Sequence, residues 1–167
     1  DNGFVTKLFG VETSNNGFSL NGAFPNDGTK NGSYYNGTTV ETQAVKDNDS
    51  VEFFVYQDKY ALDKMAWFSQ NGVVTNTITA KPSAAIELVL NGICFGWYGG
   101  NYKDAVELHA VGSAIEYAQL AWVNTADGTL TNIEGAVTDA DGNVTLTMPE
   151  EKGTSYLTAY MPAPDIE

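Results

Sequence analysis

Short runs in which apolar and polar residues alternate, separated by clusters of Asn, Asp and Gly, constrain the fold of this chain most strongly. The clusters include NNG, NDG, KNG, DNDS, QNG, ADG and DADGN, and these residue types accept the positive φ values of tight turns. Alternation at every second position places one side of a strand on a core and the other in solvent. The pattern predicts an all-β fold of antiparallel sheets.

The predicted strands cover most of the chain. They span 4–12, 17–24, 37–45, 50–57, 72–80, 84–92, 93–99, 105–112, 117–124, 128–138, 143–149 and 155–162, and the segment 58–70 is predicted as a helical turn or two. This is more than one small immunoglobulin-like sandwich holds. We therefore expect an antiparallel β-sandwich with two packed lobes, 1–104 and 105–167.

Acidic residues greatly outnumber basic ones. The chain has 8 basic residues, all lysine, against 21 Asp and Glu, for a net charge of −13 at pH 7. A nucleic-acid binder or a binder of anionic membranes needs a basic footprint, so we expect neither partner. Phosphate and carboxylate ligands would also be repelled, which leaves neutral ligands, cations, or proteins with basic surfaces.

Cysteine usage and apolar runs bear on location. Cys94 is the only cysteine, so no internal disulfide can form. The sequence has no apolar stretch long enough to cross a bilayer, and its start, DNGFVTKLFG, lacks the pattern of a signal peptide. We expect a mature or excised part of a larger multidomain protein. A reducing compartment and a disulfide-free bacterial surface protein both fit the single cysteine.

Residue patterns for catalysis or zinc binding are poorly supported. His109 is the only histidine and lies in the predicted strand AVELHAVG, whereas Cys94, between Ile93 and Phe95, is typical of a small core residue. One His and one Cys supply neither a triad nor a zinc site. Among 21 acidic residues, no carboxylate pair is singled out for glycoside hydrolysis. We expect no enzyme activity and no cofactor.

The DADGN segment raises the question of calcium. Asp139, Asp141 and Asn143 alternate, and Glu150 follows eleven residues after Asp139. An EF-hand loop needs glycine at its sixth position and flanking helices, whereas Gly142 here stands fourth and the flanks are predicted strands. A hairpin turn is the preferred interpretation, and an opportunistic calcium site at Asp139 and Asp141 is the alternative.

Aromatic residues cluster in or beside predicted loops, most densely in NGICFGWYGGNY (91–102). The glycines around Trp97 and Tyr98 remove neighbouring side chains and would leave the rings bare. Bare rings offer a flat apolar face at little rotamer cost, on which a sugar ring can stack. The predicted ligand-binding residues are Trp97, Tyr98, Tyr102, Trp67, Phe68, Tyr60, Asp58, Lys59, Asn101 and Lys103. For each ring, a place in the hydrophobic core is the alternative.

Two parts of the chain resemble known extracellular modules. GAVTDADGNVTLTMP (135–149), followed by GTSYLTAYMP (153–162), resembles the end of bacterial immunoglobulin-like surface modules. NGTTVETQAVKDNDSVEFFVYQDKY (36–60) is similar to a segment of β-modules in multidomain proteins of gut bacteria. Some of those proteins adhere to carbohydrate, including starch, and others are adhesins or spacers. The resemblance implies an immunoglobulin-like C-terminal lobe and an extracellular or cell-surface location.

These observations lead to a hypothesis for function. We interpret the chain as a non-catalytic carbohydrate-binding module of a secreted or cell-surface bacterial protein. The expected partner is a polysaccharide or oligosaccharide, and its assignment as α-glucan (starch, maltooligosaccharides) comes from the resemblance alone. The alternative is a structural immunoglobulin-like spacer or adhesin module without a small ligand, which would bury nearly all its aromatic rings.

Overall fold

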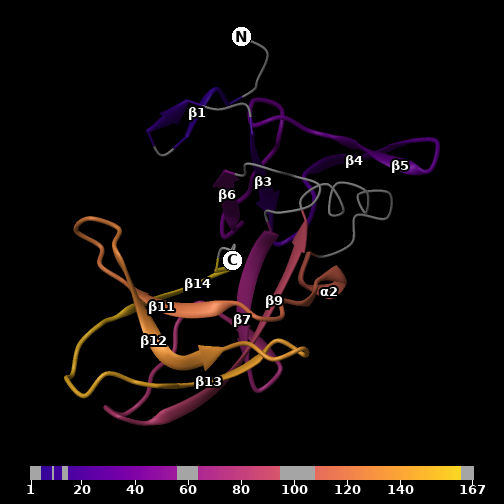
Figure 1. Cartoon of the computed structure of the whole chain (residues 1–167). Coiled ribbons are helices and arrows are strands. Elements are labelled where there is room, and N and C mark those ends of the chain that lie inside the picture. The colour runs from indigo at the N-terminus through magenta and orange to yellow at the C-terminus, as the bar shows by residue number, and fades with distance from the viewer. Residues whose placement is uncertain (1–4, 9, 13–14, 56–63, 95–107, 163–167) are drawn as a thin grey trace, which may run out of the picture. The chain divides into compact units, whose positions relative to one another are not determined.

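The computed structural model describes residues 5–8, 10–12, 15–55, 64–94 and 108–162 (Figure 1). These residues form an all-β structure with several antiparallel sheets, as the sequence predicted, together with the four-residue helix α2 (Leu108–Val111). No helix in the described part of the chain is long and apolar enough to span a membrane.

The chain divides into two compact units. The first is formed by Asp1–Met65 and Gly92–Gly112, and the second by Ala66–Asn91 and Ser113–Glu167. The predicted boundary between lobes, near residue 104, falls within 95–107, outside the described residues, so it stays a prediction.

The described residues of the first unit form small antiparallel strand pairs. Phe18 and Phe53 face each other across one pair, with ring centroids 5.7 Å apart. On the opposite side of the same pair, Ser19 is buried and its hydroxyl donates to the Glu52 carboxylate at 3.4 Å. The pairs are β1 (Lys7–Leu8) with β2 (Val11–Glu12), β3 (Asn16–Leu20) with β6 (Val51–Val55), and β4 (Asn26–Asn31) with β5 (Tyr34–Gly37).

The second unit holds a three-stranded sheet and most of a five-stranded sheet. The three-stranded sheet has the order β12–β11–β14, from β11 (Gln119–Val123), β12 (Leu130–Val137) and β14 (Tyr156–Tyr160). The five-stranded sheet has the order β10–β9–β7–β8, with β13 also pairing β9. Its strands are β7 (Lys64–Gln70), β8 (Val73–Thr75), β9 (Ala85–Cys94), β10 (Ser113–Ala114) and β13 (Asn143–Thr147).

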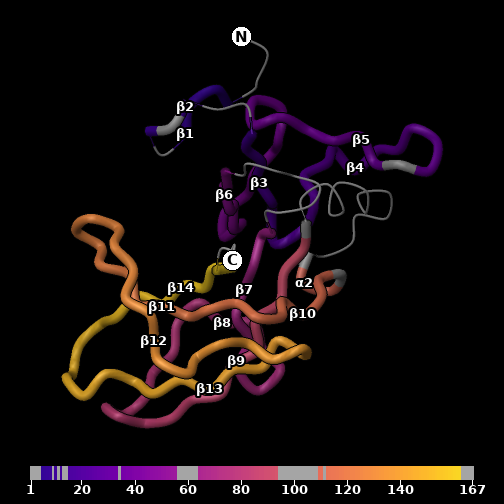
Figure 2. Tube along the Cα trace, in the orientation of Figure 1, coloured from indigo at the N-terminus to yellow at the C-terminus, as the bar shows by residue number. Residues whose placement is uncertain are grey.

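The core of the second unit follows the predicted alternation. Val144 and Leu146 are buried between exposed neighbours on β13 and face Leu88 and Ile86 on β9. The same cluster includes Leu120, Ile133 and Ala136 from the three-stranded sheet. The two sheets therefore share one core, an arrangement consistent with a β-sandwich. Figure 2 traces the path of the chain through β11, β12, β13 and β14.

A bulge interrupts β12, and the side chain of Gln119 fills it. Ala121 on β11 faces Asn132, but Gln119, two residues earlier, faces Val137, so residues 133–136 leave the regular ladder. A bulge of this kind leaves main-chain groups without ladder partners. Gln119 Nε2 donates to the main-chain oxygens of Leu120, Ile133 and Ala136 at 2.7, 3.0 and 3.2 Å.

Thr138 ties the end of β12 to the segment that precedes β11. Its side chain is 1% exposed. Thr138 Oγ1 accepts a hydrogen bond from the Ala118 N–H at 2.8 Å and donates one to the Ile115 carbonyl at 2.7 Å. Tyr117, between these two residues, has a φ of +58°, and its N–H donates to the Thr138 carbonyl at 3.0 Å.

Some predicted elements are wrong. Within 58–70, residues Lys64–Gln70 form strand β7 rather than a helical turn, because the side of β7 that carries Phe68 packs on the core of the second unit and tertiary packing overrides local preference. Within 105–112, Leu108–Val111 is helical. Residues 38–45 are not a strand: the Gln43 N–H donates to the Thr39 carbonyl at 2.9 Å, which closes a turn.

The structure contains two hairpins that the sequence analysis did not predict, β1–β2 and β4–β5. The predicted strand 4–12 contains β1 and β2, which double back at Gly10, where φ is +82°. The segment 26–37, rich in Asn, Asp and Gly, forms β4 and β5, although its composition favours loops. Here Lys30 faces Tyr35, and the ammonium nitrogen lies 4.5 Å from the centre of the ring.

Candidate functional site

Most of the predicted ligand-binding residues lie outside the part of the chain that the structure describes. They fall in 56–63 and 95–107, and they are Asp58, Lys59, Tyr60, Trp97, Tyr98, Asn101, Tyr102 and Lys103. Their role in binding stays a prediction.

The remaining two predicted residues, Trp67 and Phe68, lie next to each other on β7 and are both half-buried. Phe68 packs against the core of the second unit and faces Thr75 of β8. Because neighbouring residues of a strand point to opposite sides, Trp67 lies on the other side of β7. The structure therefore does not place these two rings on one surface.

Titratable residues considered for catalysis or metal binding are also placed by the structure. His109 lies in helix α2, rather than in a strand, and is half-buried. Cys94 is the last residue of β9. Among the described residues, no group of three or more His, Cys, Asp and Glu could hold a metal ion.

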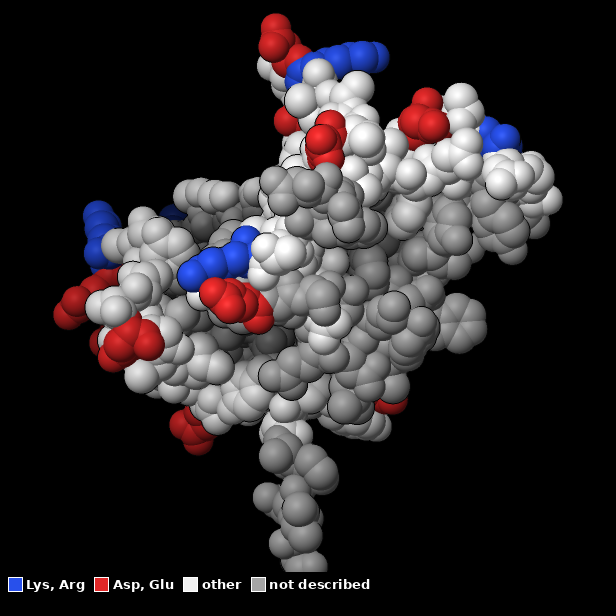
Figure 3. Space-filling view, turned by 90° about the horizontal axis from the view of Figure 1, so that it is seen from above, with Lys and Arg blue, Asp and Glu red and all other residues white. Residues whose placement is uncertain are grey.

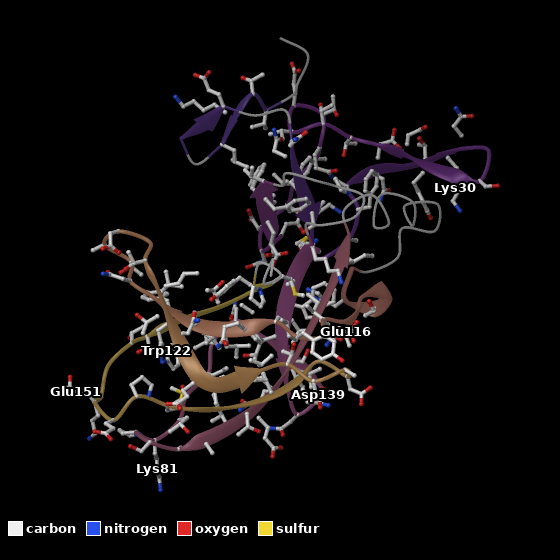
Figure 4. The ribbon with its side chains drawn as sticks, in the orientation of Figure 1. Lys30, Lys81, Glu116, Trp122, Asp139 and Glu151 are labelled. Atoms are coloured by element: carbon white, nitrogen blue, oxygen red, sulfur yellow. The ribbon has the colours of Figure 1, made fainter. Side chains whose placement is uncertain are left out.

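The DADGN segment forms a turn organised by Asp139, which Figure 4 labels. The turn connects β12 to β13 and so carries the chain between two sheets. Asp139 Oδ1 accepts hydrogen bonds from the N–H groups of Asp141 and Asn143 at 2.9 and 2.8 Å, and Oδ2 accepts one from Asn143 Nδ2 at 3.1 Å. The side-chain and main-chain bonds from Asn143 hold the pKa of Asp139 below its ordinary value.

Close packing beneath this turn explains its glycine. Gly142 has a φ of +76°, and a Cβ built there would lie 2.5 Å from the Leu90 carbonyl oxygen. The Gly142 carbonyl in turn accepts a hydrogen bond from the Leu90 N–H at 2.9 Å. The segment is thus a turn docked on β9, with its carboxylate engaged by N–H donors.

The outer face of the three-stranded sheet, which the sequence analysis did not single out, is the clearest candidate surface. It consists of the side chains that point away from Leu120 and the core. Three cross-strand rows compose it, namely Leu130–Val123–Tyr156, Asn132–Ala121–Thr158 and Val137–Gln119–Tyr160. We call this surface the tyrosine face. None of the residues in these rows is charged, in a chain whose net charge is −13, although the exposed Glu134 lies in the β12 bulge between Asn132 and Val137.

Tyr160 is held in place on the tyrosine face. Its hydroxyl donates to Asn132 Oδ1 at 2.8 Å. Tyr160 is on β14 and Asn132 on β12, with β11 between them, so the ring reaches across strands that are about 5 Å apart. Ala121 lies in its path and is 0% exposed although it points outward. The ring therefore crosses β11 between Gln119 and Ala121, and the complete burial of Ala121 is consistent with cover by this ring.

Part of the tyrosine face is open to solvent, while Gln119, Val123 and Thr158 are half-buried. Tyr156 is 56% exposed, Leu130 46% and Val137 44%, whereas Trp122, on the other side of β11, packs against the core (Figure 4). Figure 3 shows one side of the molecule, on which acidic and basic side chains lie at scattered positions. A sheet face with exposed rings and no charge can offer apolar contact and neutral hydrogen bonds to a ligand.

The signal for this surface was present in one strand. In YLTAY, residues Tyr156, Thr158 and Tyr160 alternate with the core-facing Leu157 and Ala159. Strand alternation therefore predicts two tyrosines on one side. Their partner residues on β11 and β12 depend on register, which a single strand does not reveal.

Comparisons with known proteins give no match: no family model, no curated protein and no solved structure is similar to this chain.

Proposed function

We propose that this chain is a non-catalytic carbohydrate-binding module, and the observation that supports this most directly is the tyrosine face. The Tyr160 ring crosses β11 beside the buried Ala121 and its hydroxyl is bonded to Asn132, so we expect its outward side to be a preformed platform. A sugar ring has an apolar C–H face that can stack on such a platform. The hydroxyl of Thr158, in the neighbouring row, supplies a neutral hydrogen-bonding group for the sugar.

Preorganisation favours binding here. Immobilising a free side chain costs about 0.5–1.5 kcal/mol on association, and the hydrogen bond to Asn132 has already restricted Tyr160 in the free protein. Two aromatic contacts contribute about 1 kcal/mol each beyond burial, which corresponds to a modest affinity in the micromolar to millimolar range. Weak modules of this kind bind polymers well when several act together.

The more specific parts of the proposal come from the resemblance. They are an α-glucan ligand such as starch, an extracellular or cell-surface location on a bacterium, membership of a larger multidomain protein, and an immunoglobulin-like C-terminal lobe in a two-lobed sandwich. Trp97 and Tyr98 remain proposed as further ligand contacts. The competing spacer hypothesis expects nearly all rings to be covered, whereas Tyr156 is 56% exposed, which favours a binding role.

A pull-down tests the proposal. Wild-type protein should be retained on insoluble starch and eluted by soluble maltooligosaccharides, with less retention on cellulose and xylan. Retention on cellulose or xylan, but not on starch, would support a carbohydrate-binding function and overturn the α-glucan assignment. If none of the three polymers retains the protein, the proposed function is refuted.

A further inference from the structure

We infer that the tyrosine face binds an extended, uncharged polysaccharide chain that lies lengthwise along β14, with separate sugar units stacked on Tyr156 and Tyr160. This inference rests on the proposed function and names the shape and charge of its ligand. The ligand is a stretch of linear polymer, rather than a single sugar.

The spacing of the two rings carries the first step. Tyr156 and Tyr160 are four residues apart on the same side of one strand, so their Cα atoms are about 13 Å apart at a rise near 3.3 Å per residue. A single pyranose ring is too small to touch both tyrosines. A ligand that contacts both must contain several linked sugars, and Thr158 lies between the two rings to meet its hydroxyl groups.

The surroundings of the rings carry the second step. Beside Tyr156, the same row continues with Val123 and Leu130, and Val137 stands in the row of Tyr160. Leu130 and Val137 are each nearly half exposed. Apolar surface thus extends from each tyrosine across β11 to β12, where it can contact the side of a ligand that lies along β14.

The charge distribution carries the third step. No residue in the three rows of the tyrosine face is charged, and the one charged residue of the β12 bulge between Asn132 and Val137, the exposed Glu134, is negative like the whole chain at −13. An anionic polysaccharide would be repelled by that net charge and would find no cation on this face. A neutral polysaccharide has no such cost, and its binding should depend little on salt, because no ion pair forms that salt could screen.

Oligosaccharides of increasing length test the inference. The full chain is titrated calorimetrically with glucose and with linear malto-, cello- and xylo-oligosaccharides, at low and at moderate salt. In the series that binds, affinity should rise with length until the ligand spans both rings, and then level off. Affinity should change less than about two-fold between the two salt concentrations, since exposed ion pairs are what salt weakens.

Matched variants locate the effect. Tyr156→Ala removes a half-exposed ring and should weaken the longest oligosaccharide by up to about ten-fold, the equivalent of one stacked aromatic, with no change for the shortest. Ala121→Leu should displace the Tyr160 ring and flatten the length dependence in the same way. Tyr35→Ala, a tyrosine of the first unit, is the control and should leave every affinity unchanged.

The outcomes separate the inference from the proposed function. If oligosaccharides bind but affinity is independent of length, or if Tyr156→Ala and Ala121→Leu behave like Tyr35→Ala, the inference is wrong and the carbohydrate-binding function stands at another site. Preference for an anionic polysaccharide such as polygalacturonate would also overturn the inference. If no series binds and no insoluble polymer retains the protein, the proposed function falls and the inference falls with it.

Discussion

Replacement of Thr138 by valine should strongly destabilise the second unit, although the two side chains have nearly the same shape. The hydroxyl of Thr138 is fully buried and makes two hydrogen bonds, accepting from the Ala118 N–H and donating to the Ile115 carbonyl. Valine leaves both main-chain groups buried and without that partner. Each unsatisfied group costs about 1–3 kcal/mol, and the added methyl group returns roughly 0.8 kcal/mol.

The expected loss for Thr138→Val is therefore about 2–4 kcal/mol in the free energy of unfolding. Thr138→Ser keeps the hydroxyl and removes only a methyl group, so it should cost about 1 kcal/mol. Thr145→Val is the matched control, because Thr145 is exposed on β13; it should change stability by less than about 0.5 kcal/mol.

Urea denaturation, followed by tryptophan fluorescence and far-UV circular dichroism, measures these differences. The midpoint should shift while the slope stays constant, which indicates a change in stability rather than in the denatured state. Equal losses for the valine and serine variants would mean that packing, not hydrogen bonding, is what Thr138 contributes. A valine variant as stable as wild type would refute the reasoning altogether.

Three further predictions concern the DADGN turn between β12 and β13, the bulge in β12, and stability in acid. Gly142→Ala should cost more than Gly28→Ala by about 1–3 kcal/mol, because both glycines have positive φ but only the Cβ at 142 would meet the Leu90 carbonyl; equal urea midpoints would contradict this. Gln119→Leu should cost about 1–3 kcal/mol by leaving carbonyl groups of the bulge without their donor, measured in the same assay. Asp139 has a lowered pKa, so its contribution to stability is present above its ordinary value of 3.8 and is lost as pH falls through the folded pKa. Asp139→Asn should therefore reduce the slope of stability against pH below about pH 4, and an unchanged slope in acid denaturation would argue against this role.

The sequence predicted best those strands whose core contacts follow strict alternation. The predicted strand 143–149 contains β13, and 84–92 corresponds closely to β9, because Val144 and Leu146 repeat at every second residue. The pattern was misleading in 64–70, where Met65 and Phe68 are also spaced as on a helix. This segment forms a strand rather than a helix because β7 pairs with other strands of the five-stranded sheet.

The candidate site was harder to predict because it is made by pairing. Tyr160, Ala121 and Asn132 come from three strands, and only the register of β11 with its neighbours brings them together. The bulge at 133–136 sets that register, and nothing in the local composition of β12 specifies its length. The aromatic loops at 56–63 and 95–107, on which the sequence analysis relied, lie outside the described residues.

The bulge in β12 also limits how the three-stranded sheet can grow. A bulged edge with Gly135 and the exposed charge of Glu134 is a poor template for an added strand. β14, on the other edge, pairs with β11 in unbroken register and carries no charge, glycine or proline between Tyr156 and Tyr160. Among the described strands, β14 pairs only with β11. Pairing of two copies through their β14 edges would therefore be isologous and would close after two copies, rather than propagate into a filament.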